Sequence, residues 1–126
     1  MTTIAKQTTF RHKLAYYAEL SYLQYENLRH QYFLDWCGKI AHQKYIPLKW
    51  LSKNDYLKNW FDDQWVALVE GGIKRQYNTE LDAGIFDKDD VLLMLDTFYL
   101  DLQYFPKILI EKIIKAQKYE NQESNP

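Results

Sequence analysis

The stretch from Thr8 to Lys44, TTFRHKLAYYAELSYLQYENLRHQYFLDWCGKIAHQK, decides the fold of this chain. It contains no proline, and Gly38 is its only glycine. Apolar residues recur along it at spacings of mostly three and four: Phe10, Leu14, Tyr17, Leu20, Leu28, Tyr32, Trp36 and Ile40. A helix with about 3.6 residues per turn places such side chains on one face. The stretch therefore predicts an amphipathic helix, which Thr8 or Thr9 would cap.

The length of this helix requires a break or a partner. About 35 helical residues would extend roughly 50 Å at 1.5 Å per residue. A compact chain of this size is only about 35 Å across. We expect the helix to bend or break, with Asn27 and Gly38 as candidate sites and Gly38 favoured. The alternative is an unbroken helix that projects and pairs with a second copy in a homodimer.

Further helices are expected after this stretch. Pro47 disfavours helix around it, so residues 45–51 are predicted to form a connector. Ser52 suits the N-cap of a second helix, which the pair Gly71-Gly72 should end. Residues 73–86 show no convincing period and predict a loop with at most one helical turn, near Thr79–Asp82.

The last third of the chain predicts two more helices. Asp87 should cap a third helix that is apolar nearly all round and therefore expected in the middle of a bundle. Pro106 suits the first position of a fourth helix. Residues 119–126 are polar and predict a disordered tail. The whole pattern predicts an all-α fold, a compact bundle of four to five helices forming a single domain over residues 1–118.

Composition limits the cellular setting and the kind of chemistry. No stretch of about 18 apolar residues is present, and the first residues lack the apolar core of a signal peptide, so we expect no membrane span and a cytoplasmic protein. The lone cysteine, Cys37, suits a reducing compartment and a place in the core. The three histidines do not have the spacing of a metal site, and no nucleophile stands near a base. We therefore expect no enzyme activity, no metal and no cofactor.

Charge is unevenly distributed along the chain. Residues 1–54 carry eight basic and three acidic residues, a net charge of +5. Residues 55–105 carry four basic and eleven acidic residues, a net charge of −7. These segments either neutralise each other by packing together or form two faces that meet charged partners. The basic half also permits a nucleic-acid-associated accessory protein, binding through Arg11, Lys13, Arg29 and Lys39.

Tyrosine is the most unusual component, with eleven in 126 residues. Several lie off the apolar stripe of the first helical stretch, and tyrosine is enriched at protein interfaces. The alternative is that a broken helix buries both of its faces in a bundle. The sequence thus predicts a non-enzymatic protein-binding module: an inhibitor, immunity, adaptor or regulatory accessory protein of bacterial or phage type. The residues predicted to bind the partner are Arg11, Tyr16, Tyr22, Tyr25, Arg29, Asp62 and Asp63.

Overall fold

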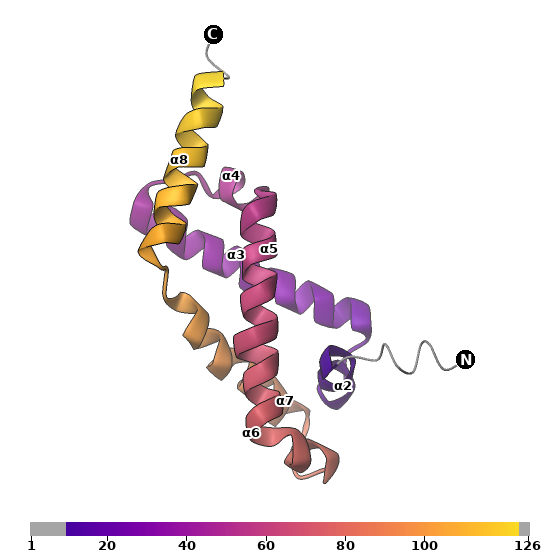
Figure 1. Cartoon of the computed structure of the whole chain (residues 1–126). Helices are drawn as coiled ribbons and strands as arrows, with labels where there is room; N and C mark the ends of the chain where they lie inside the picture. The colour runs from indigo at the N-terminus through magenta and orange to yellow at the C-terminus, as the bar shows by residue number, and fades with distance from the viewer. Residues whose placement is uncertain (1–9, 124–126) are drawn as a thin grey trace, which may run out of the picture.

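The computed structural model describes residues 10–123, and all their regular structure is helical (Figure 1). The predicted all-α fold is confirmed, with more helical segments in the described residues than the four to five expected. The elements are α2 (Phe10–Tyr17), α3 (Tyr22–Lys44), α4 (Leu48–Ser52), α5 (Asp55–Gln64), the π-helical turn η1 (Trp65–Glu70), α6 (Gly71–Asp82), α7 (Lys88–Tyr99), the 3₁₀ turn η2 (Leu100–Gln103) and α8 (Lys107–Glu123).

The first helical stretch breaks between α2 and α3, not at Asn27 or Gly38 as expected. Glu19 adopts the left-handed conformation, with φ 57°, and Leu20 N–H bonds back to the carbonyl of Ala15 at 2.9 Å. This is a Schellman ending with glutamate in the place that glycine usually takes. Ser21 then caps α3 in a reciprocal capping box with Gln24. Gly38 lies inside α3, which at 23 residues spans roughly 35 Å and fits within a compact molecule.

Gly71 and Gly72 do not end a helix; they lie inside one that continues to Asp82. A Cβ atom on Gly72 would stand 2.7 Å from the ring of Phe98, so the missing side chain is what lets α7 approach. The glycine that does end this helix is Gly84, with φ 70°. Its N–H bonds to the carbonyl of Leu81, and Ile85 N–H to that of Glu80, again in a Schellman motif. The predicted loop over 73–86 is therefore wrong for most of its length.

One π-helical turn, η1, joins α5 and α6 into a continuous helix from Asp55 to Asp82. Its core-facing side chains recur at every fourth position: Leu57, Phe61, Trp65, Val69, Ile73, Tyr77 and Leu81. In a pure α-helix a step of four residues advances about 40° beyond a full turn, so such a stripe would wind around to the opposite side. The wider π turn reverses part of this drift. It also places Glu70 on the same face as Trp65, five residues earlier.

Helix starts follow local capping chemistry, not always at the predicted residue. Asp87 caps α7 in a capping box with Asp90, as predicted. Ser52 is the last residue of α4, a short helix within the expected connector, and Asn54 instead caps α5 by accepting from Leu57 N–H at 3.0 Å. Pro106 directly precedes α8, close to its predicted place.

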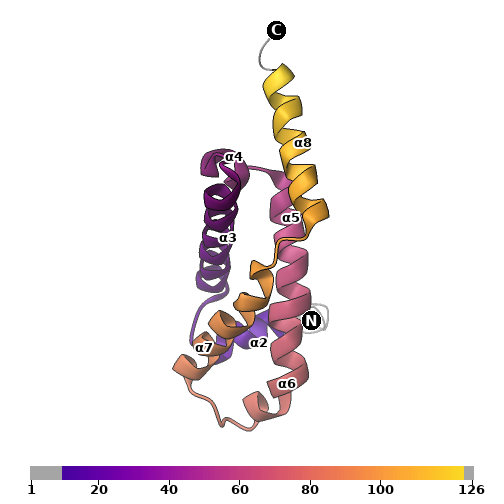
Figure 2. The ribbon, with the colours of Figure 1, turned by 90° about the vertical axis from the view of Figure 1, so that its left-hand side faces the viewer.

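Buried apolar residues from all the helices form one cluster. Trp36 of α3 is fully buried at its centre, stacked on Trp60 and packed against Phe61 and Phe105. Its indole N–H donates to the carbonyl of Leu102 at 2.9 Å. α3 crosses the long helix formed by α5, η1 and α6, while α2 and α7 pack at one end of that helix and α8 lies at the other (Figures 1 and 2).

The C-terminal third differs from prediction in two respects. α7 lies at an edge of the fold, not in its middle, because Leu93 and Leu100 are exposed at 63% and 59%. α8 runs to Glu123, so the backbone of residues 119–123 is helical where a disordered tail was predicted; residues 124–126 lie outside the described part.

Candidate functional site

Four of the seven predicted partner-binding residues meet inside the molecule, in a cluster of charged side chains that we call the internal network. Arg11 of α2 lies at its centre. Its guanidinium donates to Glu70 at 2.8 Å, to Asp62 at 3.1 Å and to Glu26 at 3.2 Å. Arg29 pairs with the same Glu26, at 2.6 Å, and with the same Asp62, at 2.9 Å. The network thus joins α2, α3, α5 and η1.

Glu70 is the most buried acid of the network, with 5% of its surface exposed. One of its oxygens, Oε2, accepts from Arg11, from the hydroxyl of Tyr25 at 2.5 Å and from the indole of Trp65 at 3.2 Å. Three donors satisfy this buried carboxylate, as a charge away from water requires. Burial raises the pKa of Tyr25, and the charge of Glu70 raises it further. Tyr25 therefore remains a hydrogen-bond donor at neutral pH.

The network shifts the pKa of one arginine, Arg11, and of one acid, Glu26. Partial burial alone would lower the pKa of Arg11, but its contacts with Glu70 and Asp62 outweigh burial and raise the pKa above its ordinary value. Burial alone would raise the pKa of Glu26, but the hydrogen bond and charge of Arg29 outweigh it and lower the pKa. Both arginines are held as structural cations. Neither is presented to solvent as a free surface charge.

The structure therefore places four of the seven predicted partner-binding residues in contacts within the chain. Arg11, Tyr25, Arg29 and Asp62 connect helices, and Tyr25 is fully buried. The remaining three are exposed and lie on three different helices: Tyr16, Tyr22 and Asp63. Tyr22 stacks on His12 with ring centres 4.3 Å apart.

The other basic residues assigned to nucleic-acid binding are also paired. Lys13 contacts Asp82 at 2.5 Å and donates to Asn78 at 2.6 Å. Lys39 pairs with Asp35 at 2.7 Å, one turn earlier on α3. The acidic and basic segments of the chain thus neutralise each other in part, which was one of the two readings of the charge pattern.

A different surface keeps both charge and apolar area, and we call it the α7 face. It is formed by Asp89, Leu93, Asp96 and Leu100, at positions i, i+4, i+7 and i+11 of α7 and the start of η2, with Asp90 and Asp101 beside them. All of these residues are exposed. No ion pair within the described part of the chain involves any of the four aspartates. Asp96 accepts a long hydrogen bond, 3.3 Å, from the hydroxyl of Tyr32.

A pocket between α6 and α7 adjoins this face. Its rim includes Leu93 and Asp90, and its apolar lining comes from Tyr77, Phe86 and Phe98. Tyr77 meets both phenylalanine rings edge-on, with centres 5.5 and 6.4 Å apart. Phe98, one of the lining residues, packs directly on Gly72 of α6, where a Cβ atom would stand 2.7 Å from its ring. Ile85, exposed at 65%, lies in the loop between the two helices.

The sequence did not single out Glu70, Trp65, Leu93 or Leu100. Glu70 could not be found from helical spacing, because only a π turn brings it onto the core face. Leu93 and Leu100 were hidden by the apolar character of the whole helix. A weak signal did exist: the alternation of Asp89, Leu93, Asp96 and Leu100 along one helical face.

Groups that could support other functions were located as well. Cys37 lies in the core, as predicted, and burial raises its pKa to about 12, so it is not a ready nucleophile. Across residues 10–119, whose side chains the structure describes, no three His, Cys, Asp or Glu residues gather in a way that could hold a metal ion. Among the described helices, none has the length and apolar character needed to cross a membrane.

Comparison with protein-family models, with curated proteins and with solved structures finds no match to this chain.

Proposed function

We propose that this chain is a non-enzymatic protein-binding module whose α7 face receives a basic, partly apolar segment of another protein. The observation that carries the proposal is the exposure of Leu93 and Leu100 between aspartates that no described cation neutralises. Removing two leucines from water favours association, and the flanking aspartates favour a basic partner. An inhibitory, adaptor or regulatory role, in the cytoplasm, follows as part of the same proposal.

The location of the other charges supports the choice of this face. The basic and aromatic residues of 10–45 were the competing surface. Arg11, Arg29 and Tyr25 are engaged in the internal network, and Lys13 and Lys39 in ion pairs. Using them for a partner would require breaking those contacts. The α7 face requires no such rearrangement.

The test is capture of partners from cells of the source organism with matched surface variants. Asp96→Lys reverses one charge within the α7 face, and Asp63→Lys makes the same change at an exposed position of α5. We expect wild type and Asp63→Lys to capture the same protein, and Asp96→Lys to lose it. Direct titration of the identified protein should reproduce this order, with Asp96→Lys weaker by about tenfold or more.

Two outcomes would overturn the proposal. One is loss of the partner in Asp63→Lys with retention in Asp96→Lys, which would assign binding to α5. The other is a gel shift with nucleic acid that weakens steeply as salt rises, because such binding is the mark of phosphate contacts. Circular dichroism of each variant ensures that only folded proteins are compared.

A further inference from the structure

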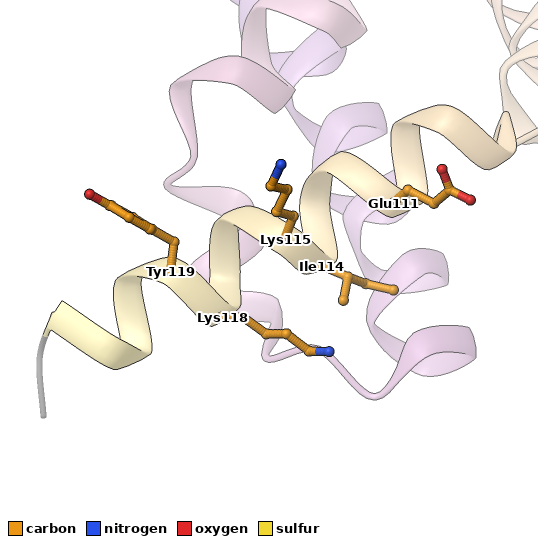
Figure 3. Close-up of a pocket in the computed structure, with 5 residues that line it drawn as sticks. All are labelled: Glu111, Ile114, Lys115, Lys118 and Tyr119. Atoms are coloured by element: carbon orange, nitrogen blue, oxygen red, sulfur yellow. The ribbon is translucent and has the colours of Figure 1, made fainter.

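A second charged helix face lies at the far end of the molecule, on α8. This helix packs through Leu109, Ile110 and Ile113. Its opposite side is exposed and carries Ile108, at 65%, and Tyr119, at 61%. Between them lie three of the four lysines of the helix and one exposed acid: Lys112, Lys115, Lys118 and Glu111. The ammonium of Lys112 lies 5.8 Å from the centre of the Tyr56 ring on α5. Figure 3 shows Lys115, Lys118 and Tyr119 projecting from the helix, where with Ile114 and Glu111 they line a pocket.

The spacing on α8 matches that of the α7 face. Ile108, Lys112, Lys115 and Tyr119 occupy positions i, i+4, i+7 and i+11, as the four residues of α7 and η2 do. Both strips are therefore roughly 16 Å long. Placed antiparallel, Ile108 meets Leu100, Lys112 meets Asp96, the stem of Lys115 crosses Leu93, and Tyr119 meets Asp89. Each pair joins apolar to apolar, opposite charges, or a hydroxyl donor to a carboxylate.

Because of where α7 and α8 lie in one chain, the contact between the α7 face and α8 joins two copies of the chain. Within one chain α7 and α8 lie toward opposite ends and run in the same general direction (Figures 1 and 2). A two-fold axis across the long dimension reverses the second copy. Each α8 then runs antiparallel to the α7 of the other copy, and the contact forms twice. A closed two-fold pair of this kind is the commonest form of homo-oligomer.

We infer that the occupant of the α7 face, when no other protein is bound, is α8 of a second copy of this chain. The inference rests on the proposed function and adds its regulation: the antiparallel homodimer covers the face, and the external partner must displace α8. Charge complementarity between the α8 strip and the α7 face carries it. The first helical stretch, the other candidate for pairing between copies, is broken at Glu19 and gives no projecting helix.

The test is the molar mass of the full chain by light scattering over a concentration series at low and moderate salt. We expect a monomer–dimer equilibrium that weakens as salt rises. Lys112→Glu and Asp96→Lys should each weaken dimerisation by about tenfold or more, since each change occurs twice in the dimer. The double variant restores an opposite-charge pair and should dimerise within about threefold of wild type. The matched control is Lys58→Glu, which makes the same charge change at an exposed position of α5.

The outcomes separate this inference from the proposed function. A chain that stays monomeric at all concentrations, or a dimer that survives Lys112→Glu, overturns the inference and leaves the α7 face free to bind another protein. The proposed function is decided by capture with Lys112→Glu, which removes α8 from competition without altering the α7 face. Capture should be retained or increased in this variant. If the captured partner binds wild type and Lys112→Glu equally well, α8 does not compete with it, and the regulatory role of the dimer is overturned as well.

Discussion

The internal network and the α7 face both contain several acidic side chains, but in opposite environments. Both place aspartate or glutamate next to large apolar side chains on neighbouring helical turns. In the network, every acid contacts an arginine, and Glu70 also accepts from Tyr25 and Trp65. On the α7 face the aspartates face solvent beside Leu93 and Leu100. Charge alone therefore does not mark a binding surface; what distinguishes the two regions is whether the charge already has a partner.

The comparison is tested most strongly by removing one acid from each region. Glu70→Ala leaves the partly buried Arg11 without its nearest partner and the Tyr25 hydroxyl without its acceptor, while the Trp65 indole keeps only the Tyr25 oxygen. We expect a loss of about 3–5 kcal/mol in the free energy of unfolding. Asp96→Ala should change it by no more than about 0.5 kcal/mol. Urea unfolding followed by circular dichroism measures both. Equal losses would show that contacts of the acids with other side chains do not distinguish the two regions.

A smaller effect is expected from a single hydroxyl of the network. Tyr25→Phe keeps the buried ring and removes one donor to Glu70, which should cost about 1–3 kcal/mol. Tyr16→Phe removes a hydroxyl from a ring exposed at 75% and serves as the control, with no measurable change expected. If both variants unfold at the same urea concentration, the hydrogen bond to Glu70 contributes nothing.

The network also predicts a dependence of stability on acid. The pKa of Glu26 is lower in the folded protein than its ordinary value of 4.5, so near that pH the unfolded chain binds more protons. The stabilisation is therefore complete above pH 4.5 and is lost as the pH falls through the lowered pKa. Glu26→Gln should be less stable than wild type at pH 6 and should lose less stability between pH 5 and 3. Denaturant unfolding at several pH values measures this, and parallel profiles would contradict it.

A variant of the α7 face is expected to change stability least and binding most. Leu93→Ser removes apolar surface that is already in water, so the free energy of unfolding should stay within about 0.5 kcal/mol of wild type. The same variant should lose the captured partner and weaken the homodimer. Thermal unfolding and light scattering on one sample measure both. A large loss of stability would show that Leu93 belongs to the core.

Local chemistry predicted much of this fold, and long-range pairing accounts for what it missed. The start of α7 followed from Asp87, and the apolar pattern identified most of the helices, although not α4 or α6. The break at Glu19 was missed because no glycine marks it, although Ser21 and Gln24 carry a recognisable capping box. Gly72 was misread because its role depends on Phe98, 26 residues further along the chain.

The candidate site was less predictable for the same reason. Arg11 lies 59 residues from Glu70 in the chain, and no local pattern shows that they touch. Without that contact, Arg11 and Arg29 read as surface cations. The apolar run around Leu93 was read as buried because periodicity shows which residues are apolar, whereas exposure depends on how many neighbours surround the helix.

The π turn η1 has a consequence for variation in chain length. Every residue after Trp65 in the long helix takes its rotational position from the width of that turn. A π turn contains about one residue more than the α-helical turn it replaces, so deleting one residue between 65 and 70 would convert it to α-helix and leave Ile73, Tyr77 and Leu81 near their present positions. The same deletion would change the spacing between Trp65 and Glu70, whose contact depends on the wider turn. A one-residue deletion in this turn is therefore expected to spare the apolar core of the long helix and to disrupt the internal network.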